Sequence, residues 1–136
     1  MYFLLFLTLD GIEVGTMGPY VHNTKTDSRV EYYQLENAWG DVDLFFEDNA
    51  IDEIANRCAS LIDYGESDYF NSEKCAVILK WIGERLSNPT TLRYHELLEV
   101  LRDFCERAIE LNTGVVIDFW NPLINFLAHF GTDYRK

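Results

Sequence analysis

The strongest constraint on the fold comes from two long apolar patterns in the second half of the chain. In residues 91–112 and again in residues 71–88, apolar side chains recur every three or four positions, as on one face of an amphipathic helix. Pro89 separates the two patterns and ends the first. The candidate N-cap residues are Asn71 or Ser72 for the first helix and Thr90 or Thr91 for the second. The sequence therefore predicts two long helices that share a core.

Shorter helices are expected on either side of this pair. Residues 48–62 have the same apolar spacing, and Gly65 is a suitable stop. Gly114 is expected to supply the left-handed residue that ends the helix before it. Asn121 and Pro122 have the cap and first-turn chemistry of a short final helix.

The first part of the chain has strand character. Residues 2–9 form an apolar run long enough for a strand that is buried on both faces. The dipeptide Asp10-Gly11 favours a hairpin turn, so residues 12–14 are expected to pair with this first strand. Residues 22–28 are polar and predict a loop. β-branched and aromatic residues predict further strands at 30–35, 42–46 and 115–119.

Together these elements predict an α+β fold, with a small N-terminal antiparallel sheet followed by about four helices. The 136 residues fit a single domain, 1–136. Apolar residues make up 48% and aromatic residues 15% of the chain, which supplies a sizeable core and excludes intrinsic disorder.

The cysteines and the apolar first residues of the chain indicate in which cellular compartment the protein is expected. Cys58, Cys75 and Cys105 are an odd number without CxxC spacing, so they are interpreted as buried small side chains in a reducing environment. The apolar start lacks basic residues before Lys25 and is shorter than the roughly 20 residues of a membrane span. A cytoplasmic location is expected.

Motifs for catalysis or metal binding are incomplete. The segment His95-Glu96-Leu97-Leu98-Glu99 differs from a zinc-binding HExxH motif because Glu99 replaces the second histidine. Phosphate-binding loops and nucleophile elbows are absent from the sequence. We therefore expect a protein that is not an enzyme and needs no metal or cofactor.

Charge is the most informative feature for function. The formal net charge is -12, which disfavours direct binding to nucleic acid or to an anionic membrane. Residues 31–73 hold twelve acidic side chains and a single basic one, Arg57, whereas residues 74–136 are neutral overall. Tyrosine, tryptophan and phenylalanine residues are interleaved with these acids.

Acidic residues mixed with aromatic ones are typical of a surface that binds a basic protein, because carboxylates accelerate encounter and aromatic rings anchor the complex. Two segments, 36–48 and 64–70, are predicted to be partner-binding loops, with Trp39 at a turn between two strands. The candidate partner-binding residues are Glu36, Trp39, Asp41, Asp43, Glu47, Asp48, Tyr64, Glu66, Asp68 and Tyr69.

The segment YGESDYF at 64–70 and the amphipathic helix YHELLEVLRDFCERAIEL at 94–111 resemble what immunity proteins of bacterial polymorphic toxins carry, especially those of contact-dependent growth inhibition systems. The resemblance lies in overall character. It implies stoichiometric binding and neutralisation of a basic cognate toxin domain, expected to be a nuclease, by a monomer or weak homodimer.

Two rival classes stay open at this point. An anti-restriction or anti-CRISPR protein that mimics nucleic acid would also be small and acidic, but it would spread its carboxylates along the whole surface. A structural or adaptor subunit would need the apolar face around Trp81 to be exposed for self-association.

Overall fold

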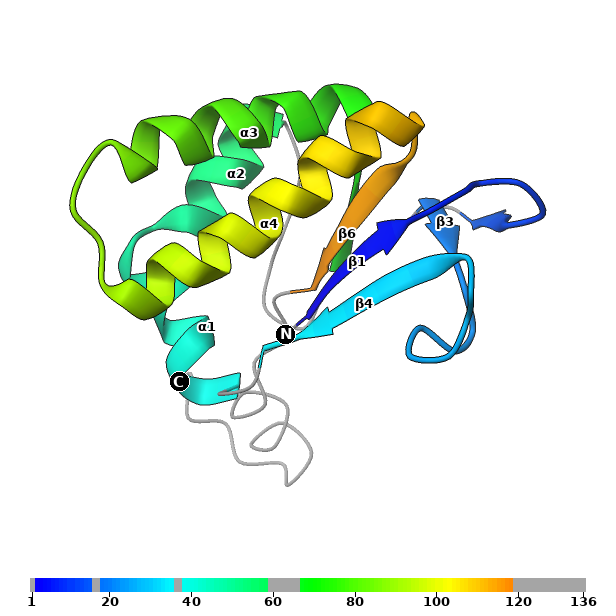
Figure 1. The fold of residues 1–136 in the computed structure, drawn as a ribbon, viewed down its shortest axis with the longest axis horizontal. Helices are drawn as coiled ribbons and strands as arrows, with labels where there is room; N and C mark the ends of the chain where they lie inside the picture. Colours follow the sequence, from blue (N-terminus) through cyan, green and yellow to red (C-terminus); the bar gives the residue numbers. More distant parts are fainter. Residues whose placement is uncertain (1, 16–17, 36–37, 59–66, 119–136) are drawn as a thin grey trace, which may run out of the picture.

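A computed structural model describes residues 2–15, 18–35, 38–58 and 67–118 (Figure 1). Within them, four helices and a four-stranded antiparallel sheet confirm the predicted α+β class. The strands are β1 (Tyr2–Phe6), β2 (Glu13–Gly15), β3 (Gly18–Tyr20), β4 (Val30–Gln34), β5 (Ser67–Asn71) and β6 (Gly114–Asp118). The helices are α1 (Ala38–Glu47), α2 (Ala50–Cys58), α3 (Ser72–Leu86) and α4 (Leu92–Leu111).

The main sheet has the order β4-β1-β6-β5, so the apolar first strand lies inside it. Phe3 and Leu5 point into the core beneath the helices, whereas Leu4 and Phe6 belong to a separate cluster on the opposite face. This confirms the prediction that the first strand is buried on both faces. Because β5 and β6 follow α2 and α4 in the chain, the sheet also includes strands from the second half of the chain.

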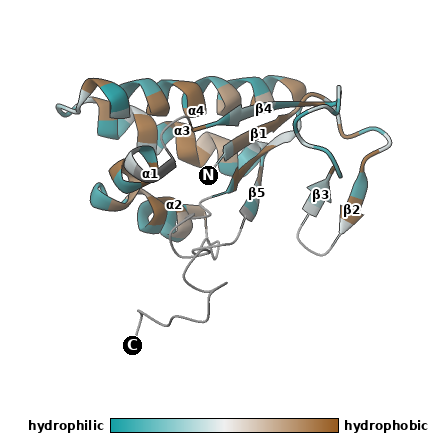
Figure 2. Ribbon diagram, turned by 90° about the horizontal axis from the view of Figure 1, so that it is seen from below, coloured by the Kyte–Doolittle hydropathy of each residue, from teal (hydrophilic) through white to brown (hydrophobic). Residues whose placement is uncertain are grey.

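Helices α3 and α4 cover one face of the sheet and pack against each other (Figures 1 and 2). Their caps are among the predicted ones, since Asn71 accepts from the Lys74 amide and Thr91 from the Tyr94 amide. Trp81 is 4% exposed, so it belongs to the core and offers no apolar surface to an adaptor. The three cysteines are buried, as expected.

The opposite face is covered by a small β2–β3 hairpin, which contributes Ile12 and Val21 from its flanks. The Asp10-Gly11 turn is present, with Gly11 at a φ of 70° and the Ile12 amide bonded to the Leu9 carbonyl at 3.2 Å. The pairing expected from it was wrong. Both edges of β1 are occupied by β4 and β6, so residues 13–15 pair with β3 instead and are exposed.

Three further expectations were wrong. Residues 42–46 and the turn before them belong to helix α1, where Val42 and Phe45 face the core one helical turn apart. Residues 67–70, predicted as part of a loop, belong to edge strand β5. Asn112, at φ 54°, supplies the left-handed residue that ends α4, and Gly114 starts β6. The predicted helix after Asn121 and the stop at Gly65 lie outside the described residues.

Candidate binding face

The structure separates the ten candidate residues that the sequence grouped together. Glu36, Tyr64 and Glu66 lie outside the described residues. Five candidates are in α1 or directly after it, and two are on edge strand β5. Trp39 lies in the first turn of α1 rather than in a turn between strands. The others are Asp41, Asp43, Glu47, Asp48, Asp68 and Tyr69.

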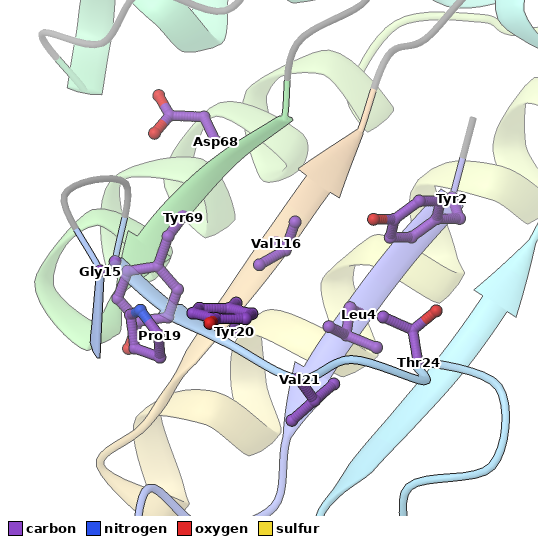
Figure 3. Close-up of a pocket in the computed structure, with 11 residues that line it drawn as sticks. Tyr2, Leu4, Gly15, Pro19, Tyr20, Val21, Thr24, Asp68, Tyr69 and Val116 are labelled. Carbon is purple, nitrogen blue, oxygen red and sulfur yellow. The ribbon is translucent and has the colours of Figure 1, made fainter. Parts of the chain in front are cut away.

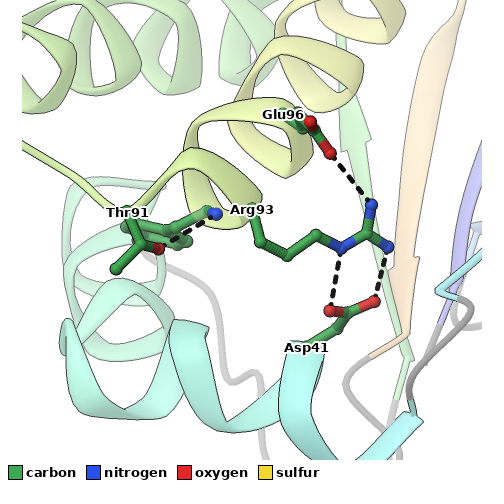
Figure 4. Close-up of polar contacts among 5 residues, drawn as sticks. Asp41, Thr91, Arg93 and Glu96 are labelled. Carbon is green, nitrogen blue, oxygen red and sulfur yellow. Dashed lines mark hydrogen bonds and ion pairs between the residues drawn. The ribbon is translucent and has the colours of Figure 1, made fainter.

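Asp41 corrects the expectation of a surface carboxylate, because it is only 2% exposed. Its two oxygens accept hydrogen bonds from Nε and Nη2 of Arg93, at 3.0 and 2.7 Å (Figure 4). Arg93 also donates to Glu96 at 3.3 Å. The bond to Asp41 is the main reason that the pKa of Arg93 is raised. This bidentate pair joins α1 to the first turn of α4, so the role of Asp41 is to hold these helices together.

Asp48 likewise joins elements within the protein. One carboxylate oxygen accepts from Arg85 Nε at 2.7 Å, and the other accepts from the hydroxyl of Tyr94 at 2.5 Å. Burial is the largest cause of the raised pKa of Tyr94, and the hydrogen bond to Asp48 is the second largest. Asp48 thus connects the end of α1 to both α3 and α4, and its charge is neutralised by Arg85.

A third acidic residue of segment 31–73 is paired with a distant arginine. Glu31 on β4 accepts two hydrogen bonds from Arg107 of α4, at 2.6 and 3.0 Å. This pairing is the largest cause of the lowered pKa of Glu31. These partners were not predicted from the sequence, because Arg85, Arg93 and Arg107 lie in the segment that is neutral overall. Their helical positions give no sign of which acid each one meets.

Asp43 and Glu47 remain as exposed acids of α1, four residues apart and hence on one side of the helix. Asp52, in the first turn of α2, is also exposed. Within the described part of the chain, none of these three carboxylates lies within ion-pair distance of an arginine or lysine. We call these three residues the helical acidic face.

Tyr69 is a packed side chain rather than a loop aromatic. Its ring meets Phe6 edge-on, with the ring centres 5.8 Å apart. It also lies against Gly114, where an added Cβ would overlap the phenol ring. Burial raises its pKa. Asp68, the neighbouring residue on β5, is partly exposed.

The described residues contain no group of three or more histidine, cysteine, aspartate and glutamate side chains that could hold a metal ion. The near-match to a zinc motif gives a surface contact, in which His95 Nε2 lies 3.8 Å from Glu99 Oε1. Burial raises the pKa of Cys58 to about 11, so at neutral pH this thiol stays protonated.

Comparison of the chain with models of protein families, with curated proteins and with solved structures found no match. Among the described helices, none has the length and apolar character needed to cross a membrane.

Proposed function

We propose that this chain is an inhibitor that binds a basic protein through the helical acidic face, in the manner of an immunity protein that neutralises a toxin nuclease by occlusion. The observation that carries the proposal is the exposure of Asp43, Glu47 and Asp52 on consecutive helices, without an ion pair among the described residues. Unpaired surface acids of one sign repel each other and steer a basic partner. The proposal assigns the protein no catalytic activity and no cofactor.

The division of roles among the acids supports this assignment. Glu31, Asp41 and Asp48 are bonded to arginines, which leaves them little capacity to attract a partner. The acids of the helical acidic face lack this compensation within the described residues. A binding surface of this kind would act mainly on the association rate, because rim charges govern encounter more than they govern dissociation.

The test needs two variants with equal changes of charge. D43K/E47K reverses two exposed acids four residues apart on α1. E106K/E110K makes the same change at the same spacing on exposed positions of α4. Circular dichroism would establish that both variants keep the wild-type fold.

The wild-type chain would be used as bait in lysate of its source cells at low and high salt, and captured basic proteins would be identified by mass spectrometry. The purified partner domain would then be tested for nuclease activity. We expect the chain to abolish that activity at a one-to-one ratio. We expect D43K/E47K to slow association about tenfold or more at low salt, and less at high salt.

E106K/E110K should associate at close to the wild-type rate. Equal slowing by both variants would attribute the effect to net charge and remove the helical acidic face as the site. Failure to retain any basic protein at low salt would overturn the proposal itself.

A further inference from the structure

A cavity of about 300 Å³ lies on the sheet face opposite the helices, between the sheet and the β2–β3 hairpin (Figure 3). Its floor is aliphatic, formed by Leu4, Val21 and Val116. Three tyrosines, Tyr2, Tyr20 and Tyr69, contribute to its walls. Gly15, Gly18 and Thr24 also line it. The volume lies at the lower end of the range for small-molecule sites.

The hairpin approaches the sheet closely because of a glycine. Gly18 has a φ of +104°, and a Cβ added there would lie 3.1 Å from Cβ of Tyr69. The Tyr69 ring is itself held between Phe6 and Gly114. This wall of the cavity is therefore formed in advance of any ligand, which reduces the entropy that binding must overcome.

The other two tyrosines are held by carboxylates. Tyr20 donates its hydroxyl hydrogen to Glu13 Oε2 at 2.7 Å. Tyr2 packs against Tyr32, with ring centres 5.1 Å apart, and hydrogen-bonds to Asp118. Both bonds fix the orientation of an aromatic wall and bring negative charge close to it.

The charges around the cavity select among ligand classes. Glu13 lies beside Tyr20, and Asp118 lies beside Tyr2 on the same face of β6 as Val116, so both carry negative charge close to the aromatic walls. Asp68 shares the face of Phe70, and its side chain points away from the cavity (Figure 3). Lys25 lies over Tyr32, with Nζ 5.8 Å from the ring centre, and is not among the residues that line the cavity. Aromatic faces and carboxylates both attract cations and repel anions.

We propose that this cavity is a binding site for a compact organic cation with an apolar body, of the arylalkylamine class. The aliphatic floor takes the apolar body, and the ammonium group faces the tyrosine rings, with the carboxylates of Glu13 and Asp118 close behind them. The inference is independent of the proposed inhibitor function, since it concerns the opposite side of the sheet from α3 and α4 and uses none of Asp43, Glu47 and Asp52.

The probes are three ligands that share a phenyl ring and differ in charge: phenethylamine, 2-phenylethanol and phenylacetate. Each would be titrated into the full-length, ¹⁵N-labelled protein at neutral pH and followed by amide chemical shifts. We expect saturable shifts at Gly15, Gly18, Thr24 and Val116. Phenethylamine should bind about tenfold more tightly than the alcohol, and phenylacetate should not bind. Absence of saturable shifts, or phenylacetate binding as tightly as phenethylamine, would overturn the proposal.

Two pairs of variants locate the site. Tyr20→Ala removes a wall and should weaken phenethylamine binding about tenfold, whereas Val14→Ala, at a 71% exposed position of the same hairpin, should not. Asp118→Asn keeps the shape but removes the charge beside Tyr2, so it should weaken binding of the amine by roughly two- to fivefold and leave the alcohol unaffected.

Asp103→Asn makes the same change at an exposed position of α4 and is the control for Asp118→Asn. Asp118 lies on β6 of the main sheet, so its result decides the matter even where Tyr20→Ala loosens the hairpin. Wild-type binding of the amine by Asp118→Asn, or equal weakening of amine and alcohol, would refute the assignment of a cation site.

Discussion

The ion pair between Asp41 and Arg93 offers a quantitative test of what holds α1 against α4. Asp41 is 2% exposed, whereas the Arg93 side chain is 35% exposed. Arg93→Met therefore leaves a buried carboxylate without its guanidinium. Removing one partner of a fully buried pair costs about 3–5 kcal/mol, and partial solvent screening of Arg93 reduces the expected cost to about 2–3 kcal/mol.

Asp41→Asn should cost less, about 1 kcal/mol, because the guanidinium that remains can reach water and still has Glu96 at 3.3 Å. Arg102→Met on the same helix is the control. It removes a bidentate-capable arginine from a surface pair with Glu99 and should cost less than about 1 kcal/mol. The free energies of unfolding of the three variants would be measured by urea unfolding, monitored by circular dichroism. The dependence of each free energy on urea concentration would be compared with that of the wild type, to confirm two-state behaviour.

The order of these costs is the decisive result. If Arg93→Met destabilises the protein no more than Arg102→Met, burial of Asp41 has no energetic consequence and the reasoning fails. If Asp41→Asn costs more than Arg93→Met, the hydrogen bonds of the carboxylate matter more than its uncompensated charge.

Three other perturbations have outcomes that follow from the structure. Tyr94 has a raised pKa in the folded protein, so its contribution to stability is complete below about pH 10 and is lost as pH rises further; Tyr94→Phe should flatten the alkaline decline in the free energy of unfolding, and an unchanged decline would contradict this. Gly114→Ala should destabilise the protein by about 2 kcal/mol or more, because the new Cβ meets the Tyr69 ring and a backbone oxygen. Gly83→Ala, in an open part of α3, should instead stabilise the protein by up to about 1 kcal/mol. Thermal unfolding tests both variants, and equal melting temperatures would refute the steric argument. Native protein should resist iodoacetamide at neutral pH and react fully in denaturant, as followed by mass spectrometry, and rapid native labelling would contradict the burial of Cys58, Cys75 and Cys105.

The long helices were predictable because their patterns are long. The α4 stripe repeats over five turns and has a cap at its start, so local sequence and tertiary packing agree. The start of α1 shows the opposite case. Val42, Leu44 and Phe46 alternate as in a strand, yet the buried positions are Val42 and Phe45, which have helical spacing. A five-residue apolar run is too short to distinguish the two periods.

Strand pairing was less predictable than strand location. The Asp10-Gly11 turn formed, but pairing depends on which strands reach both edges of β1, and β6 is separated from it by more than 100 residues of sequence. Edge strand β5 has the polar sequence SDYFN, and only its alternation of Tyr69 and Phe70 between the two faces marks it as a strand. Such a short alternation is a weak signal without knowledge of β6.

The candidate site shows why a linear charge map overstates a binding surface. Counting acids in residues 31–73 treats each carboxylate as available, whereas folding brings Arg85, Arg93 and Arg107 onto Asp48, Asp41 and Glu31. Those three acids hold helices and sheet together, and only the remaining ones can attract a partner. The charge excess therefore has two separable parts: loss of a paired acid should appear in unfolding experiments, and reversal of the helical acidic face should appear in association rates with the fold intact. A single assay of either kind would confuse them, and for that reason the two sets of variants should be compared in both assays.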